Sequence, residues 1–154
     1  MKELFKNISL ILVISSCVVF LCNYLQTQFL FLYLANNLIS LLLTLLAINT
    51  ATLGLIASKM QDILVDKPDF NFSRTINEMK ISLLEQIILI CVSILTLILQ
   101  SSKIVVLSNK DLVSNIILVS VLIYSINILW DTGKGVFVVI EELQKLRNKD
   151  GKNS

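Results

Sequence analysis

Hydrophobic residues in this chain gather into four long runs, separated by short stretches that carry the polar and charged residues. The runs cover about residues 8–25, 37–58, 81–99 and 112–130. Each is close to the roughly 17–25 residues that a helix needs to cross about 30 Å of hydrocarbon. The runs are continuously apolar and lack the alternation of a barrel strand, so helices are expected. The pattern predicts an all-α fold: a single integral membrane domain, residues 1–154, built as a bundle of four transmembrane helices.

The composition fits this interpretation and excludes a soluble domain. Of the 154 residues, 55% are hydrophobic and only 16% are charged, which is too apolar for one soluble core to absorb. The charges are also unevenly spread. They are absent from residues 7–58 and concentrate in a predicted loop, 59–80, and a predicted tail, 131–154.

The basic residues predict how the chain is oriented. Eleven of the thirteen fall before the first run, between the second and third, or after the fourth; the other two, Lys103 and Lys110, lie between the third and fourth. Cytoplasmic segments are enriched in Lys and Arg, so both termini and the loop 59–80 are expected in the cytoplasm. Trp130, at the inner end of the fourth run, suits an interfacial anchor.

The N-terminus allows a second interpretation. "MKELFK" followed by "ISLILV" resembles the start of a signal peptide, and "ISSC" resembles a lipoprotein cleavage box ending at Cys17. The apolar run continues through residues 18–21, however, where a mature lipoprotein normally has a polar tether. A retained first helix is therefore expected, with cleavage at Cys17 as the alternative.

Three local signals predict helix boundaries. Asn36 or Asn37 is expected to cap the second helix. Pro68, the only proline, should stop the second helix near Val65 or Asp66. Thr75 and Glu78 form a T-x-x-E pattern, a capping box that would start the third helix before it enters the membrane.

The chain shows no signature of an enzyme. It has no histidine, no Gly-rich phosphate loop and no nucleophile elbow. Its three cysteines, Cys17, Cys22 and Cys91, fall inside predicted spans without metal-type spacing and are interpreted as packing residues. No catalysis, cofactor, metal or direct nucleic-acid binding is expected.

Small residues form a stripe along the second predicted span. They recur at spacings of four and three, which places them on one face of a helix and permits close approach of another helix. We expect this stripe to be a packing surface, within the bundle or between copies in a homo-oligomer. Its members are Ser40, Thr44, Ala47, Ala51, Gly54 and Ser58.

Polar residues interrupt the second, third and fourth runs. Lipid offers them no hydrogen bonds, so they should face one another, another copy or water. Two interpretations stay open: hydrogen bonds that hold a bundle together, or a polar path through the membrane. The candidates are Asn49 and Thr52, then Ser82, Glu85, Ser93 and Thr96, and finally Ser120, Tyr124, Asn127 and Asp131.

The tail after the fourth run predicts a further helix. It opens with a Gly133-Lys134-Gly135 interruption and then places Val136, Ile140 and Leu143 on one face, broadened by Phe137 and Val139. This is the pattern of an amphipathic cytoplasmic C-terminal helix, which would lie on the membrane lipid or receive a soluble partner. Phe137, Ile140 and Leu143 are the predicted docking residues.

In overall design the chain resembles small bacterial phage-defence membrane proteins. The resemblance rests on four short spans with both ends inside, on "AINTATLGLIASKMQDI" leaving the membrane, and on "SRTINEMK" leading back into it. Similarity to the Kiwa membrane subunit implies an oligomeric inner-membrane sensor of infection that works with a soluble cytoplasmic partner. Similarity to Rex-type exclusion proteins implies an ion-conducting effector that depolarises the membrane. A bacteriocin immunity protein is the third alternative.

Overall fold

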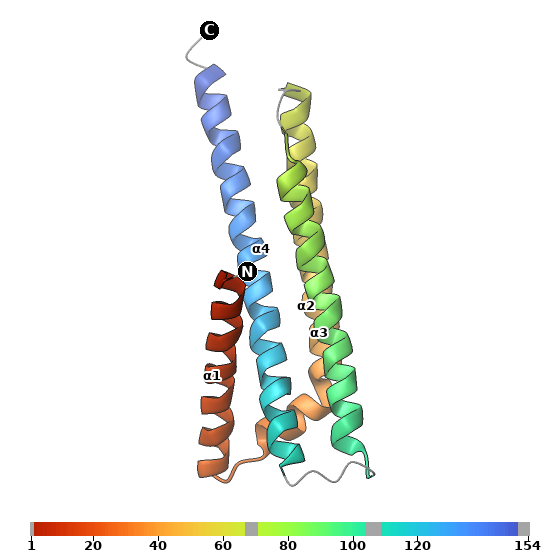
Figure 1. The fold of residues 1–154 in the computed structure, drawn as a ribbon. Helices are drawn as coiled ribbons and strands as arrows, with labels where there is room; N and C mark the ends of the chain where they lie inside the picture. Colours follow the sequence, from red (N-terminus) through yellow and green to blue (C-terminus); the bar gives the residue numbers. More distant parts are fainter. Residues whose placement is uncertain (1, 67–70, 104–108, 151–154) are drawn as a thin grey trace.

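The computed structural model describes residues 2–66, 71–103 and 109–150, without the side chains of residues 2–6, 66, 142–143 and 145–150. It consists of α1 (Lys2–Tyr24), α2 (Phe29–Asp66), α3 (Ser73–Ser101) and α4 (Lys110–Asp150), as Figure 1 shows, and the described residues form no strand. All four helices contain a segment long and apolar enough to cross a membrane. The predicted all-α, multi-pass membrane architecture is confirmed at this level.

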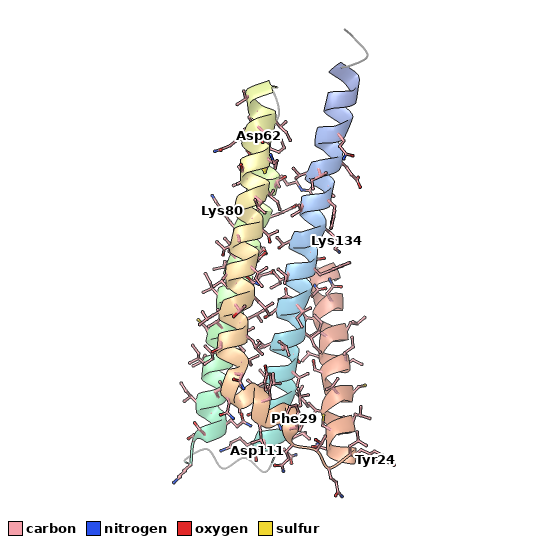
Figure 2. The ribbon with its side chains drawn as sticks, turned by 180° about the vertical axis from the view of Figure 1, so that it is seen from behind. Tyr24, Phe29, Asp62, Lys80, Asp111 and Lys134 are labelled. Atoms are coloured by element: carbon pink, nitrogen blue, oxygen red, sulfur yellow. The ribbon has the colours of Figure 1, made fainter. Side chains whose placement is uncertain are left out.

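The bundle has two unlike ends. At one, which we call the hairpin end, α2 finishes beside the start of α3 and α4 runs past the start of α1 (Figure 1). The other, called the opposite end, holds the α1–α2 and α3–α4 connections. Figure 2 shows Tyr24, Phe29 and Asp111 at the opposite end, and Asp62, Lys80 and Lys134 toward the hairpin end.

The central helix is α4. It packs against α1, α2 and α3, whereas α1 packs mainly on α4. Toward the opposite end, α1, α2 and α4 share an apolar core of Val19, Leu34, Leu38, Leu42, Leu118, Val119 and Val121. A smaller cluster at the hairpin end joins Leu53, Ile56 and Met60 of α2 to side chains of α3 and α4. The two clusters are separated along α2 by Asn49.

Helix α2 begins earlier than predicted, at Phe29, so Asn36 and Asn37 lie inside it. Their side-chain amides donate to the carbonyls four residues back, at 2.9 and 3.0 Å, and the predicted cap is wrong. The reason is a tight reversal at Gln26, whose φ is 52°. Bonds from Thr27 N–H to Cys22 O and from Gln26 N–H to Asn23 O close a Schellman-type turn, which frees the chain to restart a helix at once.

The predicted capping box is also wrong. α3 starts at Ser73, so Thr75 and Glu78 already belong to its first turns. The Asn71 carboxamide oxygen accepts the Ser73 N–H at 2.9 Å, and Glu78 pairs instead with Arg74 at 3.0 Å. α2 ends at Asp66, as predicted, while Pro68 lies outside the described residues.

No break separates the fourth span from the tail. α4 continues through Gly133 and Gly135, so the predicted interruption and separate tail helix are wrong. A glycine inside a helix costs only about 1 kcal/mol relative to alanine. Here Val136 and Val139 pack against the cluster of Leu53, Ile56 and Met60 and hold the continuing helix in place. The tail is therefore the last part of the helix that spans the bundle.

Candidate functional site

A cavity of about 530 Å³ opens at the hairpin end among all four helices. It lies at the level of the bundle where the predicted membrane spans end. Its wall is part apolar, from residues such as Leu53 and Ile56, and part polar. The polar lining consists of Asn7 from α1, Thr75, Glu78, Ser82 and Glu85 from α3, and Tyr124, Asn127, Asp131 and Thr132 from α4.

Helical periodicity explains why these polar groups meet. On α3, Ser82 and Glu85 are three apart, and on α4 the residues Tyr124, Asn127 and Asp131 are three and four apart, so each set shares one helix face. The packing of α3 on α4 turns the two faces toward each other. The tyrosine hydroxyl and the Glu85 carboxylate are close enough to interact. Five of the predicted polar residues thus share one site: Ser82, Glu85, Tyr124, Asn127 and Asp131.

The three carboxylates of the cavity have different partners. Asp131 pairs with Lys134 at 2.6 Å and also accepts a bond from the Asn127 side-chain amide at 3.3 Å. Glu78 pairs with Arg74. Among the described residues no basic side chain pairs with Glu85. Within the described part of the chain, Glu85 is therefore the cavity carboxylate without a basic partner.

Behind the cavity wall, a hydrogen-bonded network joins α2, α3 and α4. The Asn49 side-chain amide donates to Ser82 Oγ at 3.1 Å and to Gln86 Oε1 at 3.0 Å. Ser82 Oγ lies 3.4 Å from Thr132 Oγ1, and Thr132 itself donates to the Ile128 carbonyl at 3.1 Å. Each hydroxyl has one proton to donate, so the direction of the bonds is fixed. Asn49 donates to Ser82, Ser82 donates to Thr132, and Thr132 donates to the Ile128 carbonyl.

This network is buried but incompletely satisfied. Asn49 is 0% and Gln86 is 3% exposed. Asn49 Oδ1 and Gln86 Nε2 have no hydrogen-bond partner among the described residues. A buried polar atom without a hydrogen bond costs about 1–3 kcal/mol of stability. Losing either of the two bonds that Asn49 donates would add to this cost. The network consequently ties α3 to α2 at one level of the bundle.

Three other predicted polar residues do not join the site. The hydroxyls of Thr52, Ser93 and Thr96 donate to carbonyls four residues back on their own helices, at 2.9, 2.8 and 2.8 Å. A hydroxyl satisfied in this way needs no partner across a helix interface. These three residues lie in the helices expected to span the membrane, as predicted, but they form no hydrogen bond to another helix among the residues that the structure describes.

The small-residue stripe points away from the bundle. Ser40, Thr44, Ala47, Ala51, Gly54 and Ser58 are all exposed. A Cβ built on Gly54 would meet nothing within 4 Å. The predicted packing within the bundle is therefore wrong, because α2 turns its leucine and isoleucine face to α4 and α3 instead. Packing between copies stays a prediction.

The predicted docking residues lie on the part of α4 beyond the cavity. Phe137 is 68% and Ile140 is 41% exposed, and Val138 beside them is 59% exposed. The side chain of Leu143 lies outside the described residues. Val136 and Val139, which the sequence placed on the same face, are instead half-buried against the hairpin-end cluster.

Two members of the network were missed from the sequence. Gln86 and Thr132 are not among the polar candidates of the sequence analysis. A signal did exist for Gln86. It is a polar residue inside the third apolar run, and its long amide side chain can both donate to and accept from Asn49.

The cysteines and the comparisons with other proteins add no further site. Cys17, Cys22 and Cys91 are free, and no group of histidine, cysteine or carboxylate side chains in the described part of the chain could hold a metal ion. Comparisons with family models, curated protein sequences and solved structures find no match.

Proposed function

We propose that the protein is an oligomeric multi-pass component of bacterial antiphage defence that senses infection at the inner membrane and acts through a soluble cytoplasmic partner. The observation that carries the proposal is the continuity of α4. This helix contacts the other three, lines the polar cavity with Tyr124, Asn127 and Asp131, and then presents Phe137 and Ile140 on an exposed surface. The resemblance in layout to small phage-defence membrane proteins supports the biological setting.

A rigid helix with this placement can couple the membrane part of the bundle to the exposed face of α4 beyond the cavity. A change in how α1, α2 or α3 packs on the membrane part of α4 moves the helix as a unit and shifts the exposed face beyond the cavity. Coupling of this kind requires two arrangements of one element with different affinity for the partner. Exposed aromatic and aliphatic side chains next to acidic and basic ones suit a protein interface with an apolar centre. Glu141 and Lys134 supply such charges.

Phage protection in cells tests the docking proposal. Phe137→Asp combined with Ile140→Asp should abolish protection, because a docked partner would have to desolvate two unpaired carboxylates at a cost of several kcal/mol. The matched control is Val65→Asp with Ile76→Asp, the same change at exposed apolar positions of α2 and α3 at the hairpin end. The control should still protect. Both variants must reach the membrane at the level of the original protein.

Two results would count against the proposal. One is full protection by the α4 variant. The other is loss of protection in both double variants at normal membrane levels, which would mean that apolar surface in general, and not the α4 face, is required.

An ion-conducting effector is the second candidate, because the cavity brings Glu85, Asn127 and Asp131 together in a membrane-spanning bundle. Within one chain the opposite half has an apolar core, so a polar path would have to pass between copies. Glu85→Gln should then change membrane depolarisation during infection. Under the docking proposal, depolarisation is unaffected by that change and the α4 variant is the damaging one.

A further inference from the structure

A second, apolar groove of about 380 Å³ runs between α1 and α3 over the surface of α4. Leu12 and Ile88 on its two sides are 45% and 51% exposed, so the groove opens to the outside of the bundle. It exists because α1 packs mainly on α4 and leaves the neighbouring face of α3 uncovered. Its apolar lining is Ile8, Ile11 and Leu12 from α1, Ile88 and Leu89 from α3, and Ile117 and Val121 from α4.

The groove meets the polar cavity at two residues. Glu85 and Tyr124 line both spaces. The two volumes each fall within the roughly 300–1,000 Å³ typical of ligand sites in proteins. Together they form one site that is apolar along the membrane-spanning part of the bundle and acidic at the hairpin end.

The charge at this junction is unbalanced. Asp131 and Glu78 have basic partners, Lys134 and Arg74, whereas Glu85 has none among the described residues. A carboxylate beside an apolar groove in a membrane is costly unless a cation or hydrogen-bond donors reach it. The occupant that complements this site therefore has an apolar chain and a head that contains a positively charged group.

We propose that the groove and cavity bind a phospholipid with a primary ammonium headgroup. The acyl chain lies along Ile88 and Ile117, and the ammonium group reaches Glu85 and the cavity. This orientation is that of a lipid in the leaflet at the hairpin end, with its head at the end of the predicted spans and its chain toward the bilayer centre. The site does not depend on the proposed role in defence.

The hydrogen-bonding capacity of the head decides between lipids. A primary ammonium offers three N–H donors, which the Glu85 carboxylate and the Tyr124 and Asn127 side-chain oxygens can accept. A trimethylammonium head has the same charge but no donor. An anionic head would be repelled by the excess negative charge of Glu85. The expected order of affinity is phosphatidylethanolamine, then phosphatidylcholine, then phosphatidylglycerol.

Native mass spectrometry of the full-length protein in detergent, with these three lipids in equal amounts, tests the headgroup. Phosphatidylethanolamine should be retained preferentially. Glu85→Gln should reduce its preference over phosphatidylcholine by about tenfold, the loss expected for one charge-assisted hydrogen bond. Glu141→Gln, the same change at an exposed position of α4 outside both spaces, should leave the preference unchanged.

A second variant tests the groove. Ser120 lines it, and its hydroxyl donates to the Ile116 carbonyl of its own helix, so Ser120→Leu fills the groove without removing a bond between helices. Retention of all three lipids should fall. Thr50→Leu, at an exposed position whose hydroxyl is likewise bonded within its helix, is the matched control and should retain lipid normally.

Equal retention of phosphatidylethanolamine and phosphatidylcholine by the original protein would overturn the proposal, as would an unchanged preference in Glu85→Gln. An equal loss in Glu85→Gln and Glu141→Gln would also overturn it, because the effect would then reflect overall charge. Cooperative thermal unfolding of each variant in the same detergent verifies the fold. If Ser120→Leu does not fold, the Glu85→Gln comparison still decides the outcome.

Discussion

The two halves of this bundle satisfy their polar groups in different ways. Toward the opposite end, the core is built from aliphatic side chains, and buried hydroxyls such as those of Ser15 and Ser93 donate to carbonyls of their own helices. Toward the hairpin end, Asn49, Ser82 and Gln86 are bonded across helix interfaces, and a cavity with three carboxylates lies beside them. A polar residue in a membrane helix therefore indicates a contact between helices only when its own helix cannot supply its hydrogen-bond partner.

This difference assigns a role to each half. The opposite half holds α1, α2 and α4 together by close packing, the main attraction available between helices in lipid. The hairpin half is held by a smaller apolar cluster and a few directed bonds around a cavity, so we expect its helices to adopt another arrangement at a smaller cost. The hairpin half, which has the smaller apolar cluster, is also the half from which α4 continues to its exposed apolar surface.

The largest expected effect is the loss of packing in the apolar half. Leu38 is 0% exposed in the core shared with α1 and α4. Leu38→Ala should lower the free energy of unfolding in mixed micelles by about 2–3 kcal/mol, because the cavity left behind loses its packing contacts. Leu43→Ala, on the exposed side of the same helix, should cost much less. Equal losses for the two variants would contradict the assigned core.

The next effect concerns the directed bonds of the other half. Asn49→Leu leaves Gln86 Oε1 and Ser82 without the donor from α2, and should cost about 1–2 kcal/mol, the upper part of the range for such bonds in membranes. Adding Gln86→Leu should restore part of the stability, because both buried partners are then removed. Ser93→Ala, which removes a hydroxyl satisfied within its own helix, is the control. A double variant no more stable than Asn49→Leu would contradict the pairing.

Much of this comparison could be predicted from the sequence, and the missing part has a physical reason. The length and apolarity of the runs were sufficient to predict four helices that could span a membrane. The i, i+3 and i+4 spacing correctly placed Glu85 with Ser82, and Tyr124 with Asn127, on shared helix faces. Spacing also grouped the stripe from Ser40 to Ser58, yet that face is exposed. Periodicity defines a face of a helix but does not say which neighbour covers it.

Helix boundaries failed for a related reason. The Gln26 turn, the start of α3 at Ser73 and the continuity of α4 through Gly133 each depend on backbone bonds or packing that a local motif does not contain. The capping patterns were chemically reasonable but lay inside helices that began earlier. Local signals are weakest where a membrane helix extends beyond the hydrocarbon, because no change of apolarity marks its end.

The smallest expected effect tests the continuity of α4. A Cβ on Gly133 would meet nothing within 4 Å, so Gly133→Ala adds helix propensity without a clash. It should raise the free energy of unfolding by about 0.5–1 kcal/mol. Destabilisation by this change, measured in the same micelles as the other variants, would indicate that the helix is broken at this position.

Labelling of single cysteines on two faces of α4 measures directly whether the cavity is open to water beside a dry core. With Cys17, Cys22 and Cys91 replaced by alanine, Asn127→Cys, which lines the cavity, and Ser125→Cys, at a position 1% exposed, are compared with a water-soluble thiol reagent. Asn127→Cys should react rapidly in inside-out vesicles and stay protected in intact cells, because the distribution of basic residues predicts that the hairpin end faces the cytoplasm. Ser125→Cys should react slowly in both. Equal rates at the two positions would contradict a water-accessible cavity beside a dry core, and rapid labelling of Asn127→Cys in intact cells would reverse the proposed orientation.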